Sequence, residues 1–204
     1  VKEVYEAIDA FAPFASQESW DNSGLLVGGM AQPADRILTT LDISEAIVAQ
    51  AVAEQVQLVV AHHPVIFSPL KTLPPDSPVY QLAAHGIAAI CVHTPLDMAP
   101  LGLNTFAHTL LEKPLALQGT QEVLEPSWTD GRGFGWIDTS ARTWTPQTLA
   151  QTLQTAFGEV RYSAAERSIR KIAYCSGSAA SMLELAAAKG CDALITGDIK
   201  HDRW

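Results

Sequence analysis

The sequence has 204 residues, of which 48% are hydrophobic and 17% are charged, so it can bury a substantial core and is not intrinsically disordered. With 13 Lys and Arg against 22 Asp and Glu, the formal net charge is −9, which argues against a nucleic-acid partner. The longest apolar runs are far shorter than the ~20 residues that cross a bilayer, so we expect no membrane partner.

Helices and strands are predicted to alternate along the first half of the chain. Apolar residues at helical spacing, Ser44 as a helix N-cap and Ser77-Pro78 as a helix start carry this prediction. In chain order the predicted elements are helix 2–12, strand 24–27, strand 36–41, helix 44–55, strand 58–61, helix 77–86, strand 88–92 and helix 101–112.

The second half begins with a change of composition. Residues 115–165 contain glycines at 119, 131, 133 and 135 and three tryptophans, followed by a helix from Thr145-Pro146 to Phe157, and are predicted to form a smaller inserted unit. A strand over 171–175, a helix over 179–189 and a strand over 193–196 then follow. We therefore predict an α/β protein with an N-terminal lobe over 1–114, the inserted unit over 115–165, and a return to the α/β lobes over 166–204. Each lobe is expected to hold a mostly parallel or mixed sheet covered by helices.

The ends and the cysteines of the chain also carry expectations. The sequence begins at Val1 without a methionine and stops at Trp204 directly after a charged cluster, which we interpret as trimming at both ends. Three cysteines without a Cys-x-x-Cys pair are typical of a reducing compartment, so we expect a cytoplasmic protein.

A shift of 135 residues places Ile37–His63 on Ile172–Asp198 without a gap. Three identities in this overlap are near chance, and any two βαβ units look somewhat alike, so the alternatives are an internal duplication and a coincidence of pattern. The matching strand and helix boundaries favour duplication. In this alignment His63 corresponds to Asp198.

Residues that can bind a metal follow three predicted strands. His62 and His63 follow the strand 58–61, His93 and Asp97 follow the strand 88–92, and Asp198 follows the strand 193–196. Ligands in open α/β sheets bind outside the carboxyl ends of the strands. Adjacent histidines on an extended backbone point to opposite sides, so we expect two ions, with His62 and His63 binding one each and Asp97 reaching between them. Imidazole and carboxylate ligands suit Zn, Fe, Mn, Co or Ni.

Other residues have plainer interpretations. A single histidine after a strand is more often a hydrogen-bonded loop residue than a ligand, and His85 and His108 are expected to serve packing or the surface. Asp42 has two possible roles, because it can line the same mouth or cap the helix that starts at Ser44. Trp20-Asp21-Asn22 is interpreted as structural.

Five motifs resemble the YbgI-like or Nif-three-like dinuclear metal centre family, whose members are named GTP cyclohydrolase I type 2 homologs. They are Glu18-Ser-Trp-Asp-Asn-Ser-Gly-Leu-Leu-Val-Gly28, Leu38-Thr-Thr-Leu-Asp42, Val60-Ala-His-His-Pro-Val-Ile-Phe67, His93-Thr-Pro-Leu-Asp97 and Thr196-Gly-Asp-Ile-Lys-His201. The motifs span nearly the whole chain and are highly specific as a set. The chain has Pro95 where the family usually has Asn.

The resemblance implies a two-lobed α/β fold, a toroidal homohexamer, and two divalent metal ions per subunit. Carried over by motif, His62, His63 and Asp97 match family metal ligands, and His93 and Asp198 are candidates for orienting them. The family's remaining ligands, a His and a Glu in a Gly-His-x-x-x-Glu segment, have no counterpart before Trp204.

The residues and the resemblance together predict a metal-dependent hydrolase-type protein that acts on a nucleotide or another ring or phosphoester substrate. The alternative is a non-enzymatic metal-handling protein or a regulatory hexameric scaffold. An enzyme that acts on an acidic nucleotide should have Lys or Arg side chains near the metals, and this feature would distinguish it from the alternative. Lys71 and Lys200 are the candidates nearest in sequence.

Overall fold

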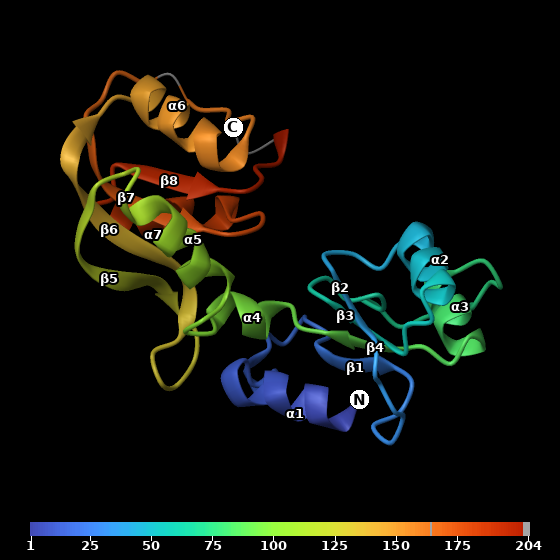
Figure 1. Cartoon of the computed structure of the whole chain (residues 1–204). Coiled ribbons are helices and arrows are strands. Elements are labelled where there is room, and N and C mark those ends of the chain that lie inside the picture. Colours follow the sequence, from blue (N-terminus) through green and yellow to red (C-terminus); the bar gives the residue numbers. More distant parts are fainter. Residues whose placement is uncertain (164, 202–204) are drawn as a thin grey trace. The chain divides into compact units, whose positions relative to one another are not determined.

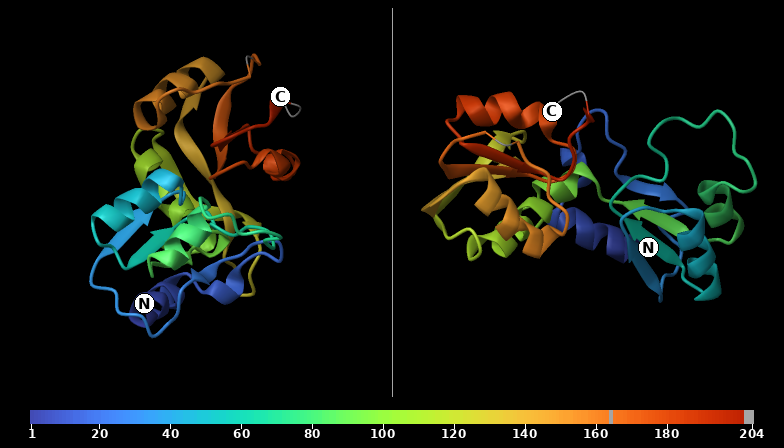
Figure 2. Two further views of the ribbon diagram at one scale, coloured as in Figure 1. Left: turned by 90° about the vertical axis from the view of Figure 1, so that its right-hand side faces the viewer. Right: turned by 90° about the horizontal axis from the view of Figure 1, so that it is seen from above.

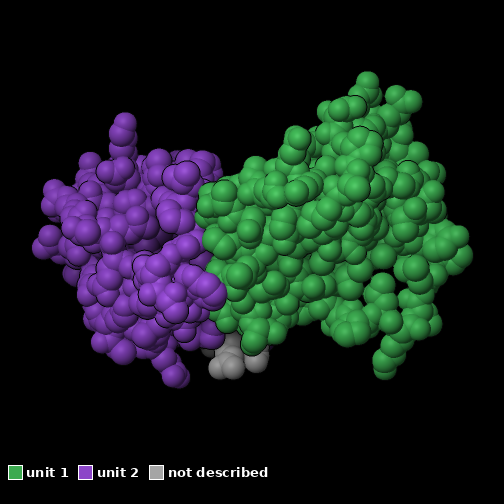
Figure 3. Space-filling model, turned by 90° about the horizontal axis from the view of Figure 1, so that it is seen from below, with its two compact units in different colours: residues 1–96 green, residues 97–204 purple. Residues whose placement is uncertain are grey.

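The computed structural model describes residues 1–163 and 165–201. The chain divides into two compact units, unit 1 over residues 1–96 and unit 2 over residues 97–204 (Figure 3). The division precedes residue 114, where the first lobe was predicted to end, and residues 115–165 and 166–204 both belong to unit 2. The described residues form two four-stranded sheets flanked by helices, which confirms the predicted fold class of two α/β lobes with mixed sheets.

Unit 1 contains a mixed sheet with the strand order β1-β4-β3-β2 (Figure 1). Strand β1 is antiparallel to β4, whereas β4, β3 and β2 are parallel to one another. The elements of the unit are α1 (Lys2–Phe11), the short 3-10 helix η1 (Phe14–Ser16), β1 (Gly24–Val27), β2 (Ile37–Thr40), α2 (Glu45–Ala53), β3 (Leu58–Ala61), α3 (Pro78–Ala84) and β4 (Ala88–Cys91).

Helices α2 and α3 cover one face of this sheet. Their buried residues Val48, Ala51 and Leu82 pack with Val59 and Ala89 of the central strands. Both helices begin where the sequence predicts, because a serine hydroxyl accepts a backbone N–H of the first turn in each. Helix α1 lies on the opposite side of the sheet from α2 (Figure 1). This packing fixes β3 and β4 as neighbouring parallel strands whose carboxyl ends meet at one edge.

Unit 2 contains a second mixed sheet with the strand order β5-β6-β7-β8. Strand β6 is antiparallel to both of its neighbours, β5 and β7, whereas β7 and β8 are parallel to each other. Helix α4 (Thr94–Met98) spans the division between the units. The elements that follow are α5 (Leu103–Glu112), β5 (Leu117–Pro126), β6 (Gly133–Trp144), α6 (Pro146–Phe157), β7 (Ile169–Cys175), the 3-10 helix η2 (Ala180–Met182), α7 (Leu183–Ala188) and β8 (Ala193–Thr196).

The second sheet is covered on both faces. Leu111 of α5 and Leu153 of α6 pack with Trp136 and Ile172 on one face. Ala186 of α7 packs in a separate cluster with residues that include Ile137, Ala173 and Cys175, on the other face. Figure 2, in its right-hand view, shows the sheet between the red α7 and the orange α6. Alternating strand residues therefore serve two cores, as the period of two in a strand requires.

The repeat predicted at a spacing of 135 residues is present in the structure. Residues 37–40 of β2 correspond to 172–175 in β7, and β3 corresponds to β8 residue for residue. The register is the same in both pairs, with Ile37 opposite Leu58 and Ile172 opposite Ala193. The helical segment 45–53 corresponds to 180–188, which is split into η2 and α7. The correspondence of elements is thus confirmed, although the neighbours of the paired strands differ between the two sheets.

None of the helices among the described residues combines the length and the apolar character that a membrane crossing would require.

Candidate metal site

Three histidines come together at the carboxyl edge of the unit 1 sheet. His62 and His63 directly follow β3, and His93 lies two residues after the end of β4. Because β3 and β4 are parallel neighbours, both chain segments leave the sheet at the same edge. The ligand atoms of the three imidazoles all lie within 4.8 Å of one another. They form a group that could hold a metal ion.

The rings of His62 and His63 lie side by side, with centroids 5.0 Å apart. The centroid of the His93 ring is 5.1 Å from that of His62 and 5.7 Å from that of His63. The expectation that the adjacent histidines point to opposite sides is therefore wrong. Its premise was an extended backbone, but β3 ends at Ala61 and both histidines lie in a bend.

Each of the three rings is oriented by a hydrogen bond at Nδ1. The acceptor is the carbonyl oxygen of Val92 for His62, at 3.0 Å. It is Oδ1 of Asp42 for His63, at 2.7 Å, and Oδ1 of Asp21 for His93, at 2.8 Å. Since a carbonyl or carboxylate oxygen only accepts, Nδ1 carries the hydrogen and the lone pair of the neutral ring is on Nε2. Metal-bound histidines are held in this way in proteins.

Asp21 is the most strongly bound of these acceptors. Its side chain is fully buried, and it also accepts hydrogen bonds from the hydroxyl of Ser23 and from the backbone N–H of Thr94. Burial by itself raises the pKa of Asp21, but the hydrogen bonds from His93, Thr94 and Ser23 outweigh it and hold this pKa far below its usual range. Asp21 therefore supplies a permanent negative charge beside His93.

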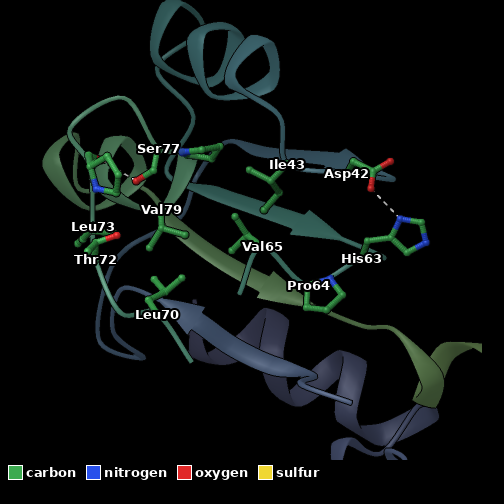
Figure 4. Close-up of a pocket in the computed structure, with 12 residues that line it drawn as sticks. Asp42, Ile43, His63, Pro64, Val65, Leu70, Thr72, Leu73, Ser77 and Val79 are labelled. Atoms are coloured by element: carbon green, nitrogen blue, oxygen red, sulfur yellow. Dashed lines mark hydrogen bonds and ion pairs between the residues drawn. The ribbon is translucent and has the colours of Figure 1, made fainter. Parts of the chain in front are cut away.

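The two possible roles of Asp42 are now distinguished. Its carboxylate binds His63 at the surface of unit 1, as the dashed line in Figure 4 shows. The N-cap of α2 is Ser44, whose hydroxyl accepts the N–H of Ile47 at 3.3 Å. Asp42 thus lines the mouth of the site, and the helix is capped without it.

The two predicted carboxylates of the site belong to unit 2. Asp97 lies in α4, where its Oδ1 accepts the hydroxyl hydrogen of Ser176 at 2.9 Å. Its carbonyl oxygen accepts Nδ2 of Asn104 at 3.0 Å. Asp198 is exposed just after β8, and its N–H donates to the carbonyl oxygen of Gly177. The structure thus brings together His62, His63 and His93 within unit 1, with His93 as a full member of the group.

Sequence reasoning missed Asp21, which was interpreted as structural. The residue is 72 positions from His93, and only the packing of the loop before β1 against the end of β4 brings the two together. Its presence in a family motif is a signal that could have identified it.

Comparisons with known proteins place this chain in a family and agree with its fold. The family model described as Duf34/NIF3 (NGG1p interacting factor 3) matches residues 1–204. The chain is 34% identical over 215 residues to the "GTP cyclohydrolase 1 type 2 homolog" of Streptococcus pneumoniae, covering 98% of this chain and 77% of that protein. It is also 34% identical over 208 residues to the "GTP cyclohydrolase 1 type 2" of Helicobacter pylori, with coverage of 98% and 77%.

Among solved structures, a Bacillus cereus protein related to NIF3 shares the fold. Its TM-score with this chain is 0.86 at 18% sequence identity, covering 98% of this chain and 82% of the other. The match of the family model over the whole chain and the identity to these relatives bear out the resemblance seen in the motifs. The chain belongs to the Duf34/NIF3 family.

Proposed function

We propose that this protein binds divalent metal ions at its histidine group and functions as a metal-dependent hydrolase with a dinuclear metal centre. In this proposal His62, His63 and Asp97 are ligands of two ions per subunit. His93 and Asp198 orient or complete the site. One observation carries the proposal: three imidazoles converge, and each is fixed through Nδ1 by an oxygen acceptor.

The donor set fits such ions. Imidazole nitrogen suits Zn, Fe, Co and Ni, and added carboxylate oxygens extend the range to Mn. Two of the three histidines are held by carboxylates, Asp42 and Asp21, which increases the basicity of the ligand nitrogen. The negative charge of these carboxylates also offsets part of the positive charge of a bound cation. The site therefore favours a cation over an anion.

When bound, divalent ions supply Lewis acidity, which polarises a substrate oxygen and lowers the pKa of water toward neutrality. The residues of this chain contribute orientation. Asp21 and the carbonyl oxygen of Val92 fix the rings of His93 and His62 from behind, so these side chains need no reorganisation when a cation arrives.

The substrate class in this proposal is a nucleotide or a related ring or phosphoester compound. The name of the Helicobacter pylori relative, "GTP cyclohydrolase 1 type 2", supports it. The proposal of hydrolase activity is supported by the name of this relative, whereas the proposal of metal binding is supported by the geometry of the histidines.

Hydrolysis can be tested with a nucleotide panel that starts from GTP, analysed by liquid chromatography and mass spectrometry. The protein is assayed after loading with Zn²⁺ or Mn²⁺, after treatment with a chelator, and as the His63→Ala variant. We expect turnover that requires metal and is lost in His63→Ala. The His85→Ala variant is a matched control, since His85 lies at the end of α3 outside the histidine group and is expected to retain turnover.

The same experiment addresses the rival function. A metal-loaded protein that turns over no compound in the panel would contradict the hydrolase proposal. It would favour a metal-handling or regulatory protein built on the same site.

A further inference from the structure

A pocket of about 310 Å³ adjoins the histidine group (Figure 4). His63 and Asp42 lie at one end, so the pocket is continuous with the candidate metal site. The pocket extends from there between the segment after β3 and the start of α3. Its lining is completed mainly by apolar side chains, namely Ile43, Pro64, Val65, Leu70, Leu73, Pro74, Pro78 and Val79, with the polar residues Thr72 and Ser77.

Much of the polar lining is already engaged within the chain. The hydroxyl of Ser77 donates to the carbonyl oxygen of Pro74 at 2.8 Å and accepts the N–H of Tyr80 at 3.3 Å. The carboxylate of Asp42 is bound to the ring of His63. Apart from Thr72, what the pocket mainly offers to a ligand is therefore apolar surface.

The charge of the lining argues against an anionic occupant. No Lys or Arg is among the described residues that line the pocket, whereas the carboxylate of Asp42 lies at its mouth. Lys71, which the sequence suggested as a counter-charge, lies between Leu70 and Thr72, but it does not share the lining role of these neighbours. A phosphate or carboxylate placed here would lose its hydration without gaining a cationic partner.

We propose that this pocket binds an uncharged, apolar group of the substrate, attached to the polar end that reacts beside His63. This inference rests on the proposed function, because it takes the histidine group as the reacting end of the same site. The pocket volume lies at the lower limit of the ~300–1,000 Å³ that is usual for ligand pockets, which suits a short alkyl chain or a single ring. In a nucleotide substrate, the phosphates would have to lie outside this pocket.

The test uses hydroxamic acids, which bind zinc through two oxygens and differ only in their tails. Acetohydroxamic acid has no tail, hexanohydroxamic acid has an alkyl tail, and adipic acid monohydroxamate has a tail of similar length that ends in a carboxylate. Their affinities for the zinc-loaded protein are measured by isothermal titration calorimetry. We expect the alkyl tail to strengthen binding about tenfold or more over acetohydroxamic acid, and the terminal carboxylate to abolish most of this gain.

A substitution in the lining ties the gain to this pocket. Leu70 is half-exposed, so Leu70→Ser removes apolar lining without opening the core. We expect it to reduce the advantage of the alkyl tail severalfold while leaving acetohydroxamic acid unaffected. The control is Leu183→Ser, which changes a similarly exposed leucine at the start of α7 in unit 2 and is expected to change neither affinity.

The outcomes separate this inference from the proposed function. If the protein does not retain zinc, the metal proposal fails. In that case, or if acetohydroxamic acid does not bind the zinc-loaded protein, the pocket is tested alone by titrating metal-free protein with hexanamide and acetamide. A preference for hexanamide that Leu70→Ser removes would support the pocket. Equal binding of all tails, a preference for the carboxylate tail, or a change of oligomeric state in Leu70→Ser would overturn the inference, the last by showing that a second copy covers this face.

Discussion

The hydrogen bond between His93 and Asp21 joins the candidate site to a fully buried carboxylate. A fully buried carboxylate loses its hydration, and it is stable only because His93, Thr94 and Ser23 supply donors. The positions of His62, His63 and His93 after two strands could be predicted, since strand ends are visible in the sequence. Asp21 could not, because its partner is 72 positions away and the contact depends on tertiary packing.

Replacing Asp21 by Asn tests the importance of this charge. The amide of Asn has one acceptor oxygen, no charge, and an NH₂ group that would face donors. We expect Asp21→Asn to weaken zinc binding by about tenfold to a hundredfold, which competition with a chromophoric chelator measures. Asp35→Asn, at an exposed position outside the site, serves as the control and should bind zinc like the wild type. Unchanged affinity in Asp21→Asn would show that His93 needs no carboxylate partner.

At the scale of elements, strands with a clear apolar pattern were predicted more accurately than exposed strands. Strand β3, which is mostly buried, and strand β8, which is half-buried, were predicted to the residue, because a short, continuous apolar run has clear ends. The long strands β5 and β6 were not predicted. Most residues of β5 are exposed, so it shows no apolar alternation. In β6, Gly133 indicates a loop when the sequence is considered alone. In the structure a Cβ added at this position would overlap the backbone of Glu125, so the glycine permits the close approach of β5.

Asp192 immediately precedes β8, and its side chain is hydrogen-bonded to the backbone of β7. Its Oδ2 accepts the backbone N–H groups of Arg170 and Lys171, each at 2.9 Å. The hydrogen bond from the backbone N–H of Lys171 is the main reason that the pKa of Asp192 is lowered. Burial opposes this change, and the hydrogen bond from Arg170 adds to it. A carboxyl group whose pKa is lowered by folding stabilises the folded state above its unfolded pKa, and that contribution is lost as the pH falls through the folded value.

We therefore expect Asp192→Asn to lower the free energy of unfolding by about 1 kcal/mol at pH 7, because the residue is only half-buried and an amide oxygen replaces part of the interaction. The difference between wild type and variant should shrink as the pH is lowered from 5 to 3. Urea denaturation at several pH values measures both. A difference that grows toward acidic pH would contradict the assigned role of Asp192.

At the scale of the whole molecule, the fold class could be predicted because alternating strands and helices leave few architectures available. The repeat at 135 residues was visible because both βαβ segments keep the same lengths. The division at residue 96 was not visible, since it falls within a helix rather than in a glycine- or proline-rich linker. Composition marks a boundary only where the chain is exposed and irregular.

We propose, from the family resemblance, that six copies assemble. Exposed apolar side chains on unit 2 agree with such an assembly: Phe106 and Leu110 lie one helical turn apart on α5. Size-exclusion chromatography with light scattering at micromolar concentration should give the mass of a hexamer. A monomer under these conditions would contradict the proposed assembly.

The proposed function requires a metal ion at the group formed by His62, His63 and His93, and the metal content of purified protein tests this requirement most directly. After loading with Zn²⁺ and gel filtration, the metal per chain is determined by inductively coupled plasma mass spectrometry for the wild type and for the single alanine variants. Circular dichroism confirms that each variant is folded. We predict that the wild type retains zinc, that replacing any of the three histidines lowers its content markedly, and that His85→Ala retains the wild-type content. A folded His63→Ala protein that binds as much zinc as the wild type would contradict the account.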